Sequence, residues 1–247
     1  MTLRIGLAAS VMRTVEIVAI ARGAGFDLLL ADTEHTSIGV GDVAQMCIAG
    51  GLAGFPVWVR AGGNGPDGLA RLVDCGAAGI VVPHVDTAAQ ASAIAAAVRF
   101  APVGRRSIPS PLALHQFRPT PPRTLVANAE PALTVVAMIE SAEGVAAADA
   151  IAAVPGIDML MVGANDLADS LGHLGNLDHP EVAAAFAAIA SATARAGKAY
   201  GVIGLPPALV GPYGTAHGAS VVIATNDVNL LFDGAERALA TVRDAAA

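Results

Sequence analysis

The chain alternates eight short runs of strand-forming residues with eight longer helical patterns. The strand candidates are residues 4–9, 27–33, 57–61, 79–85, 134–140, 158–163, 199–203 and 220–224. The helical patterns, rich in Ala and Leu, are residues 14–24, 40–49, 65–75, 87–99, 143–154, 180–196, 206–217 and 233–246. Because parallel strands need crossover helices between them, this alternation predicts a (β/α)8 barrel of the TIM type.

The length of 247 residues is usual for such a barrel, and no change of composition along the chain marks a boundary between two domains. We therefore expect residues 1–247 to form a single domain. Hydrophobic residues make up 54% of the chain and charged residues 14%. A composition of this kind supplies a large core and predicts that some apolar surface is used in subunit contacts.

The charge and the hydrophobic pattern argue against binding to nucleic acid and against association with a membrane. A net charge of -7 with no Lys/Arg run argues against nucleic acid and against an anionic membrane surface. No stretch approaches the roughly 20 uninterrupted apolar residues of a membrane-spanning helix. With no secretory signal pattern at the start, we expect a soluble, cytoplasmic protein. Cys47 and Cys75 lack metal-site spacing and are expected to be reduced core residues.

Residues 101–131 break the alternation of strands and helices. This segment holds seven of the fifteen prolines, which predicts that it forms no long regular helix. A connection of this length inside a compact domain is usually a lid, a binding loop or an interface arm. The alternative is a surface loop with no part in function.

Two acidic residues follow buried strands. Glu140 comes directly after an apolar run, and Asp166 follows another run through Gly163, Ala164 and Asn165. In α/β barrels, the loops at the carboxyl ends of the strands build the active site, so these carboxylates can hold one divalent cation. Oxygen ligands without Cys or His favour magnesium or manganese. The alternative is that both acids cap the helices that follow.

Other strand ends carry a histidine and an arginine. His35 follows Asp32 and Glu34, and a histidine side chain can give and take protons near neutral pH, although a solvated loop histidine is the alternative. Arg60 is placed to bind a carboxylate or phosphate, with an ion pair to a nearby acid as the alternative. The backbone N–H groups that open a helix at residues 163–166 can receive a substrate carboxylate.

On a barrel, all of these residues fall on the face where barrel enzymes have their active sites. Together they suit a divalent ion and an arginine that bind a 2-oxo acid, with the ion stabilising an enolate and a histidine moving protons. The one lysine, Lys198, precedes its strand. Schiff-base catalysis therefore has no obvious nucleophile.

The motifs resemble those of the HpcH/HpaI aldolase and citrate lyase β family over nearly the whole chain, and in particular its metal-dependent class II pyruvate aldolases. They are Gly25-Phe-Asp27, Asp32-x-Glu34-His35, Val59-Arg60, Leu72-Val-Asp74-x-Gly76, Val82-Pro83, Ile139-Glu140-Ser141, Gly163-x-x-Asp166-Leu167, Gly172-His-Leu-Gly-Asn176 and His179-Pro-Glu181-Val182.

The resemblance implies reversible cleavage of a 4-hydroxy-2-oxo acid or a keto-deoxy sugar acid to pyruvate and an aldehyde. It also assigns roles to single residues. Glu140 and Asp166 would ligate a magnesium, manganese or cobalt ion, and Arg60 would bind the pyruvyl group. His35, oriented by Asp74, would transfer protons with support from Asp32, and no organic cofactor is implied.

The resemblance further implies a homohexamer, a trimer of dimers, in which the last helix, residues 233–246, is exchanged between subunits. Three places depart from the family: Met138 stands where a glutamine is usual, Ala8 where a tryptophan is usual, and a proline-rich run follows Ser107 in place of a glycine-rich loop. Two alternatives stay open. They are an acyl-CoA lyase resembling citrate lyase β, and a catalytically weak barrel that binds an oxo acid.

Overall fold

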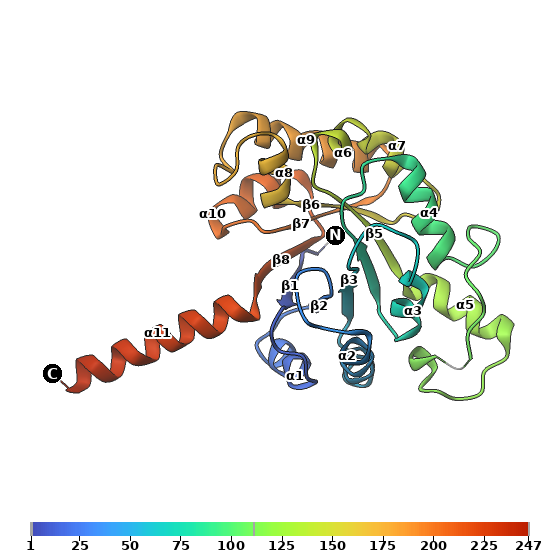
Figure 1. Ribbon diagram of the computed structural model, residues 1–247, viewed down its shortest axis with the longest axis horizontal. Coiled ribbons are helices and arrows are strands. Elements are labelled where there is room, and N and C mark those ends of the chain that lie inside the picture. Colours follow the sequence, from blue (N-terminus) through green and yellow to red (C-terminus); the bar gives the residue numbers. More distant parts are fainter. Residues whose placement is uncertain (1, 111, 247) are drawn as a thin grey trace.

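The computed structural model describes residues 2–110 and 112–246, and eight parallel strands close a barrel in sequence order (Figure 1). The strands are β1 (Arg4–Ala9), β2 (Leu28–Asp32), β3 (Val57–Arg60), β4 (Gly79–Val82), β5 (Thr134–Ile139), β6 (Met159–Gly163), β7 (Ala199–Ile203) and β8 (Val221–Asn226). The predicted (β/α)8 barrel is confirmed. Both ends of the proposed domain, residues 1 and 247, and Pro111 in the proline-rich segment lie outside the described residues.

Helices follow every strand. They are α1 (Glu16–Gly23), α2 (Val40–Ala53), α3 (Leu69–Asp74), α4 (Ala88–Val98), α5 (Pro122–Ala132), α6 (Ala142–Ala146), α7 (Ala148–Ala152), α8 (Ala164–Ser170), α9 (Pro180–Arg195), α10 (Pro207–Leu209) and α11 (Asp227–Ala246). After β7, α10 passes into a π-helical turn at Val210–Gly214 and a 3-10 turn at Thr215–His217. The sequence predicted one helix there.

Side chains alternate along each strand, so every second residue faces the interior of the barrel. The interior cluster consists of Ala8, Leu28, Leu30, Trp58, Val81, Val136, Met138, Met159, Met161, Val221 and Ile223, and all are buried. Trp58 fills space that Gly79 leaves open, because a Cβ built on Gly79 falls 2.6 Å from the indole ring. The interior is thus a packed core, and two of the family departures, Ala8 and Met138, belong to it.

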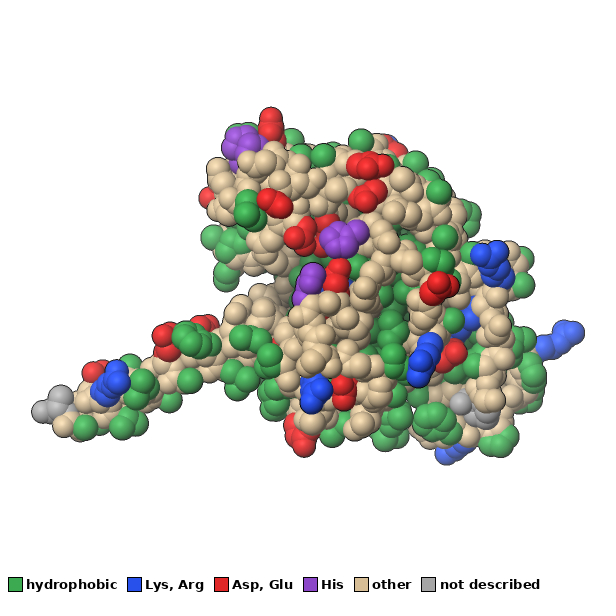
Figure 2. Space-filling model, viewed as in Figure 1, with side chains coloured by type: hydrophobic (Ala, Val, Ile, Leu, Met, Phe, Trp, Pro, Cys, Tyr) green, Lys and Arg blue, Asp and Glu red, His purple; other side chains and the backbone are tan. Residues whose placement is uncertain are grey.

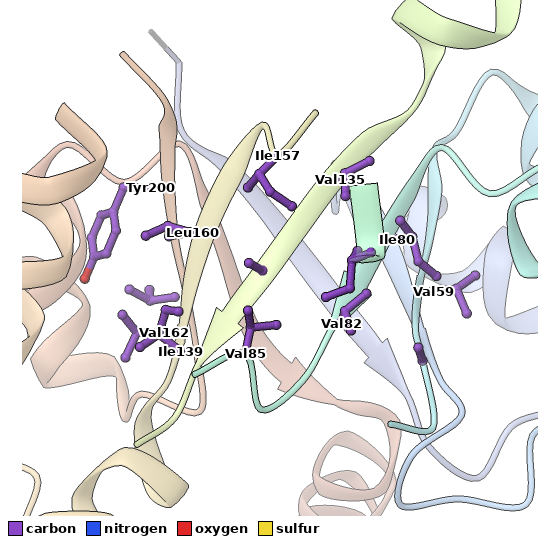
Figure 3. Packing of buried hydrophobic residues seen from close by; sticks show 14 of the residues in the cluster. Val59, Ile80, Val82, Val85, Val135, Ile139, Ile157, Leu160, Val162 and Tyr200 are labelled. Atoms are coloured by element: carbon purple, nitrogen blue, oxygen red, sulfur yellow. The ribbon is translucent and has the colours of Figure 1, made fainter. Parts of the chain in front are cut away.

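The opposite faces of the strands pack against the surrounding helices. Figure 3 shows part of this outer layer, with Val59, Ile80 and Val82 from neighbouring strands and Val135 and Leu160 further along the sheet. These side chains are all fully buried. Because the strands are buried on both faces, they read in the sequence as continuous apolar runs.

The proline-rich segment contains a helix that the sequence analysis did not predict. Residues 122–132 form α5, an 11-residue helix. Pro122 occupies its first turn, where the missing N–H has no helical partner in any case, and Pro131 comes only at its end. The prediction of no long helix was wrong because prolines at helix ends do not interrupt the helix.

The same segment connects α4 to β5, so it lies at the amino end of the barrel. Its residues Leu112 and Phe117 line a cavity of about 330 Å³ together with Cys47 and Leu52 of α2. It therefore forms no lid over the carboxyl ends of the strands within this chain.

The last helix, α11, projects away from the barrel, and the C-terminal end lies at its far tip (Figure 1). It begins at Asp227, six residues before the predicted start at 233. The side chains of Leu231, Phe232, Leu239 and Val242 are more than half exposed on it. Among the described residues, no helix is both long enough and apolar enough to cross a membrane.

Candidate active site

The alternation of inward and outward side chains also determines which residues line the carboxyl end of the barrel, here called the barrel mouth. Asp32 continues the inward row of Leu28 and Leu30, Arg60 continues that of Trp58, and Glu140 comes two residues after inward-facing Met138. Gly163 occupies the equivalent place on β6, two residues after Met161. Strand register therefore delivers three charged side chains and one glycine to the top layer of the barrel interior.

Asp32 and Arg60 form a bidentate pair. The Arg60 Nε and Nη2 groups donate to the two Asp32 carboxylate oxygens at 2.8 and 2.7 Å. Burial opposes ionisation of Asp32, but the hydrogen bonds and positive charge of Arg60 outweigh it and hold the pKa of Asp32 below its ordinary value. The pair fixes the plane of the guanidinium and leaves N–H groups on Nη1 and Nη2 for other acceptors.

Glu34 and His84 link the arginine to Glu140. Arg60 Nη1 lies 3.2 Å from Glu34 Oε2, and the other Glu34 oxygen lies 3.2 Å from His84 Nε2. On its far side, His84 Nδ1 lies 3.4 Å from Glu140 Oε2, and the His84 backbone N–H donates to the same oxygen at 3.0 Å. Figure 2 shows histidine side chains beside acidic ones near the centre of this face.

Glu140 sits in a cradle that only glycine allows. A Cβ built on Gly163 would fall 2.2 Å from Glu140 Oε1, so any larger residue would displace the carboxylate. Burial raises the pKa of Glu140, and the negative charges of Asp166 and Glu34 add to this against the lowering effect of His84. The carboxylate therefore lacks a full positive counter-charge among the described residues.

The residues after β6 lie as the sequence predicted, at the start of a helix. Gly163 ends β6 and α8 begins at Ala164, so Asp166 occupies its first turn with an exposed side chain. Ala164 is buried and Asn165 is exposed beside Gly204 of the next loop. The carboxylates of Asp166 and Glu140 are close enough to interact electrostatically.

His35 and Asp74 are not brought together in this chain. His35 has a 62% exposed side chain, and its Nε2 lies 3.5 Å from Glu34 Oε2. Asp74 accepts a hydrogen bond from Arg106 at the end of α3. A helix that follows a barrel strand runs back to the amino end, so its last residue lies far from the strand ends. Orientation of His35 by Asp74 therefore stays a prediction, which the contacts within one chain do not support.

Sequence reasoning missed two members of the site. His84 follows β4 after Val82 and Pro83, the same strand-end position that drew attention to His35. Its backbone has φ 53, in the left-handed region, which turns the imidazole toward Glu34 and Glu140. Glu34 was noted only as a neighbour of His35. Its position two residues after Asp32, whose carboxylate accepts from the Glu34 N–H at 3.0 Å, was the available signal.

A divalent cation fits the residues at the mouth. Asp32, Glu34, Glu140 and Asp166 are four carboxylates against one guanidinium, and Arg60 neutralises chiefly Asp32. Among the described residues, Glu34 Oε2 is buried without a hydrogen bond despite its ion pair with Arg60. Oxygen donors of this kind are those that magnesium and manganese prefer. Ligation by Glu140 and Asp166 stays a prediction.

Comparisons with known proteins agree with the fold and the motifs. The sequence model of the family described as HpcH/HpaI aldolase/citrate lyase matches residues 10–211. A 4-hydroxy-4-methyl-2-oxoglutarate aldolase of Hapsidospora irregularis is 39% identical over 191 residues, 76% of this chain and 71% of that protein. A hydroxypyruvate/pyruvate aldolase of Rhizorhabdus wittichii is 34% identical over 242 residues, 93% of this chain and 90% of that protein.

A solved structure extends the similarity to three dimensions. The crystal structure of an HpcH/HpaI aldolase from Desulfitobacterium hafniense superposes with a TM-score of 0.91 at 25% identity. The match covers 98% of this chain and 93% of that one. Sequence motifs, barrel topology and family match therefore lead to one conclusion: the chain belongs to the HpcH/HpaI aldolase/citrate lyase family.

Proposed function

We propose that this chain is a divalent-metal-dependent aldolase that cleaves a 4-hydroxy-2-oxo acid or a keto-deoxy sugar acid, reversibly, to pyruvate and an aldehyde. It is a carbon–carbon lyase, as its relatives' names indicate. The observation that carries the proposal is the arrangement of the barrel mouth. An arginine held in one plane by Asp32 stands beside Glu140, whose negative charge is not fully compensated.

Glu140 and Asp166 would hold the metal ion, for which we propose magnesium, manganese or cobalt. When bound, such an ion supplies Lewis-acid chemistry that draws electrons from the 2-oxo group and favours the enolate of pyruvate. The strongly acidic surroundings of Glu140 support a cation at this place. Backbone N–H groups at Gly163–Asp166 open α8 and are placed to receive the substrate carboxylate.

Arg60 would bind the pyruvyl part of the substrate. Two of its N–H groups are used by Asp32, and Nη1 also faces Glu34 Oε2 at 3.2 Å. One further hydrogen on each of Nη1 and Nη2 is left to donate to a substrate oxygen. Because Asp32 fixes the guanidinium before the substrate arrives, little reorganisation is needed as negative charge develops on that oxygen.

Cleavage of the C3–C4 bond requires a base that takes the proton of the 4-hydroxyl group. His35 is the residue that the sequence predicts for this step, and His84 is the second candidate because it lies between Glu34 and Glu140. General-base catalysis of this kind raises the rate by about 10²–10⁴-fold. The histidine whose replacement by alanine lowers kcat by that amount, with metal affinity kept, is the base.

Amine catalysis has no support in the site. The one lysine, Lys198, precedes β7 at the amino end of the barrel, and its Nζ donates to the Ile157 carbonyl at 2.7 Å. The acyl-CoA lyase alternative loses support as well. A lyase of this kind needs basic residues that grip coenzyme A, and the densest group of arginines lies in residues 105–123. Arg106 of this group is buried and paired with Asp74, and the segment lies at the end of the barrel opposite the mouth.

The test combines metals, aldehydes and variants. We expect pyruvate and a panel of aldehydes to give aldol products with magnesium, manganese or cobalt, and a chelator to abolish cleavage. Asp166→Asn keeps the volume but removes charge, and should lower activity by about 10²-fold or more with a weaker metal affinity. Inactivation by borohydride in the presence of pyruvate would refute the mechanism. Variants that change only the affinity for oxo acids would indicate a binding protein.

We further propose a homohexamer, a trimer of dimers, with α11 exchanged between subunits. The exposed apolar side chains of α11 do not pack against the barrel of their own chain, since the helix projects away from it (Figure 1). An exposed apolar stripe of this kind on a protruding helix is typical of an interface.

A further inference from the structure

A second cluster of side chains that are potential metal ligands lies where the loop between α8 and α9 meets the start of α9. One nitrogen of His173, one nitrogen of His179 and one carboxylate oxygen of Glu181 lie within 4.8 Å of one another. The two imidazole rings are stacked with centroids 3.4 Å apart. Figure 2 shows histidine and acidic side chains together at the upper left edge of the molecule, near α8.

Backbone turns hold the three residues in place. The Asn176 N–H donates to the His173 carbonyl at 2.9 Å, and the His179 N–H donates to the Asn176 carbonyl at 3.2 Å. His179 is the N-cap of α9, and Pro180 places Glu181 in the first helical turn. Because consecutive turns fold the loop back on itself, a histidine from its start meets the pair at its end.

The side chains are poised as ligands. His173 Nε2 lies 2.7 Å from Glu181 Oε2, with the His173 side chain 21% exposed and that of Glu181 68% exposed. The hydrogen bond and charge of His173, with a smaller effect of His179, lower the pKa of Glu181. The carboxylate is therefore ionised beside two rings that each carry one nitrogen lone pair when neutral, and solvent reaches the cluster from its Glu181 side. His179 Nδ1 accepts a long hydrogen bond of 3.3 Å from the Glu181 N–H, which a metal ion would replace.

We propose that His173, His179 and Glu181 bind a transition-metal ion of the zinc class, separately from the cation at the barrel mouth. Two imidazoles and one carboxylate are the ligand set that Zn²⁺, Ni²⁺ and Co²⁺ accept, whereas an all-oxygen set suits Mg²⁺. For a lone pair of each ring to point at the same ion, the two imidazoles must rotate out of the stacked arrangement. Solvent supplies the remaining coordination position.

The decisive experiment measures Zn²⁺ binding to the full chain by titration calorimetry after chelation and dialysis, with millimolar Mg²⁺ present to occupy the barrel mouth. We expect one Zn²⁺ per chain that Mg²⁺ does not displace. His173→Gln and Glu181→Gln should each weaken this binding at least about tenfold, since even the loss of outer partners costs that much at metal sites. His217→Gln, a partly buried histidine in the 3-10 turn after β7, is the matched control and should bind as the unchanged chain does.

A second measurement guards against variants that lose structure. Crystals of the unchanged protein soaked in Zn²⁺ should give an anomalous peak between His173 and His179, and circular dichroism should show that the variants fold. The proposal is overturned if the peak lies only at the barrel mouth. It is also overturned if the two variants bind Zn²⁺ as tightly as the His217→Gln control.

Discussion

Gly163 is the residue on which the geometry of the barrel mouth depends most directly. The carboxylate of Glu140 occupies the volume where a side chain on Gly163 would stand, at 2.2 Å from its Cβ position. The glycine has φ -88, which any residue can adopt, so space rather than backbone conformation is the constraint.

Gly163→Ala should therefore fold but bind the active-site metal poorly. The added methyl group moves the Glu140 carboxylate away from Asp166, and we expect the metal dissociation constant to rise about tenfold or more, with activity falling in parallel. Equilibrium dialysis with Mn²⁺ measures it. Gly23→Ala, at an open site with no atom within 4 Å of the added carbon, should change neither quantity.

The Asp32–Arg60 pair predicts a pH-dependent contribution to stability. The pKa of Asp32 in the folded state lies below its ordinary value of 3.8, so its contribution is complete above that value and is lost as the pH falls through the lower, folded-state pKa. Because the two side chains are only 6% and 14% exposed, removing one partner at neutral pH should cost about 3–5 kcal/mol.

Urea unfolding of Asp32→Asn and the unchanged chain across pH 7 to 3 checks this prediction. The difference in unfolding free energy should shrink at the acidic end, as the native carboxylate takes up its proton. Asp149→Asn is the control, since its pair with Arg195 is 60–68% exposed and should contribute less than about 1 kcal/mol. A difference that is constant with pH would contradict the assigned ion pair.

At the residue scale, sequence reasoning found the side chains that follow directly from strand ends. Asp32, Arg60 and Glu140 were found because each ends an apolar run, and the inward row of the barrel then places them together. His84 needed knowledge of a left-handed backbone turn after Pro83. The role of Asp74 beside His35 was taken from resemblance, and not from the direction in which its helix runs, so it stays a prediction.

At the scale of elements, α11 makes a prediction about assembly. Its side chains Leu231 and Phe232 are 56% and 64% exposed, and they lie on a helix that projects from the barrel. Leu231→Asp combined with Phe232→Asp should reduce the oligomer to smaller species, because charges cannot enter an apolar interface without a partner. Sedimentation velocity measures the mass.

The control for this experiment is Leu52→Asp on α2, where the side chain is 71% exposed and lies outside α11. The control chain should keep the mass of the unchanged chain. Equal masses for the double variant of α11 and the unchanged chain would refute the exchange of α11. A fall in mass that leaves each barrel folded, as judged by circular dichroism, would support it.

The elements also show where pattern reading reaches its limit. Helices with a clear apolar face, such as α9, were predicted within a residue of their observed bounds. The helix α5 was missed because prolines were counted without regard to their place in the helix. The opening of α8 at residues 163–166 was predicted, but its extent was not, because seven residues are too few to show a periodic pattern.

At the scale of the whole molecule, the barrel was predictable because closure leaves one arrangement for eight strands that alternate with helices. Each strand pairs in parallel with its neighbours in sequence order, and β8 pairs with β1. The site was less predictable than the fold. Strand order fixes which residues share the mouth, whereas the contacts of His84 and Glu34 depend on loop conformations that no periodicity encodes.

The packed interior of the barrel has a kinetic consequence. Trp58 is 1% exposed, and the Arg4 guanidinium lies 5.3 Å from its ring at the amino end, so the described side chains leave no open passage along the barrel interior. Substrate and products therefore enter and leave the proposed site only from the carboxyl end of the barrel. In the proposed mechanism, pyruvate is bound by Arg60 at the bottom of the site, so it can leave only after the aldehyde above it has left.

An ordered departure therefore follows, with the aldehyde leaving first and pyruvate last. In steady-state cleavage assays, pyruvate should inhibit competitively against the hydroxy-oxo acid, while the aldehyde should inhibit noncompetitively. Competitive inhibition by the aldehyde but not by pyruvate would show that the aldehyde leaves last. The packed interior formed by Met138, Met161 and Trp58 would then not determine the order of product release.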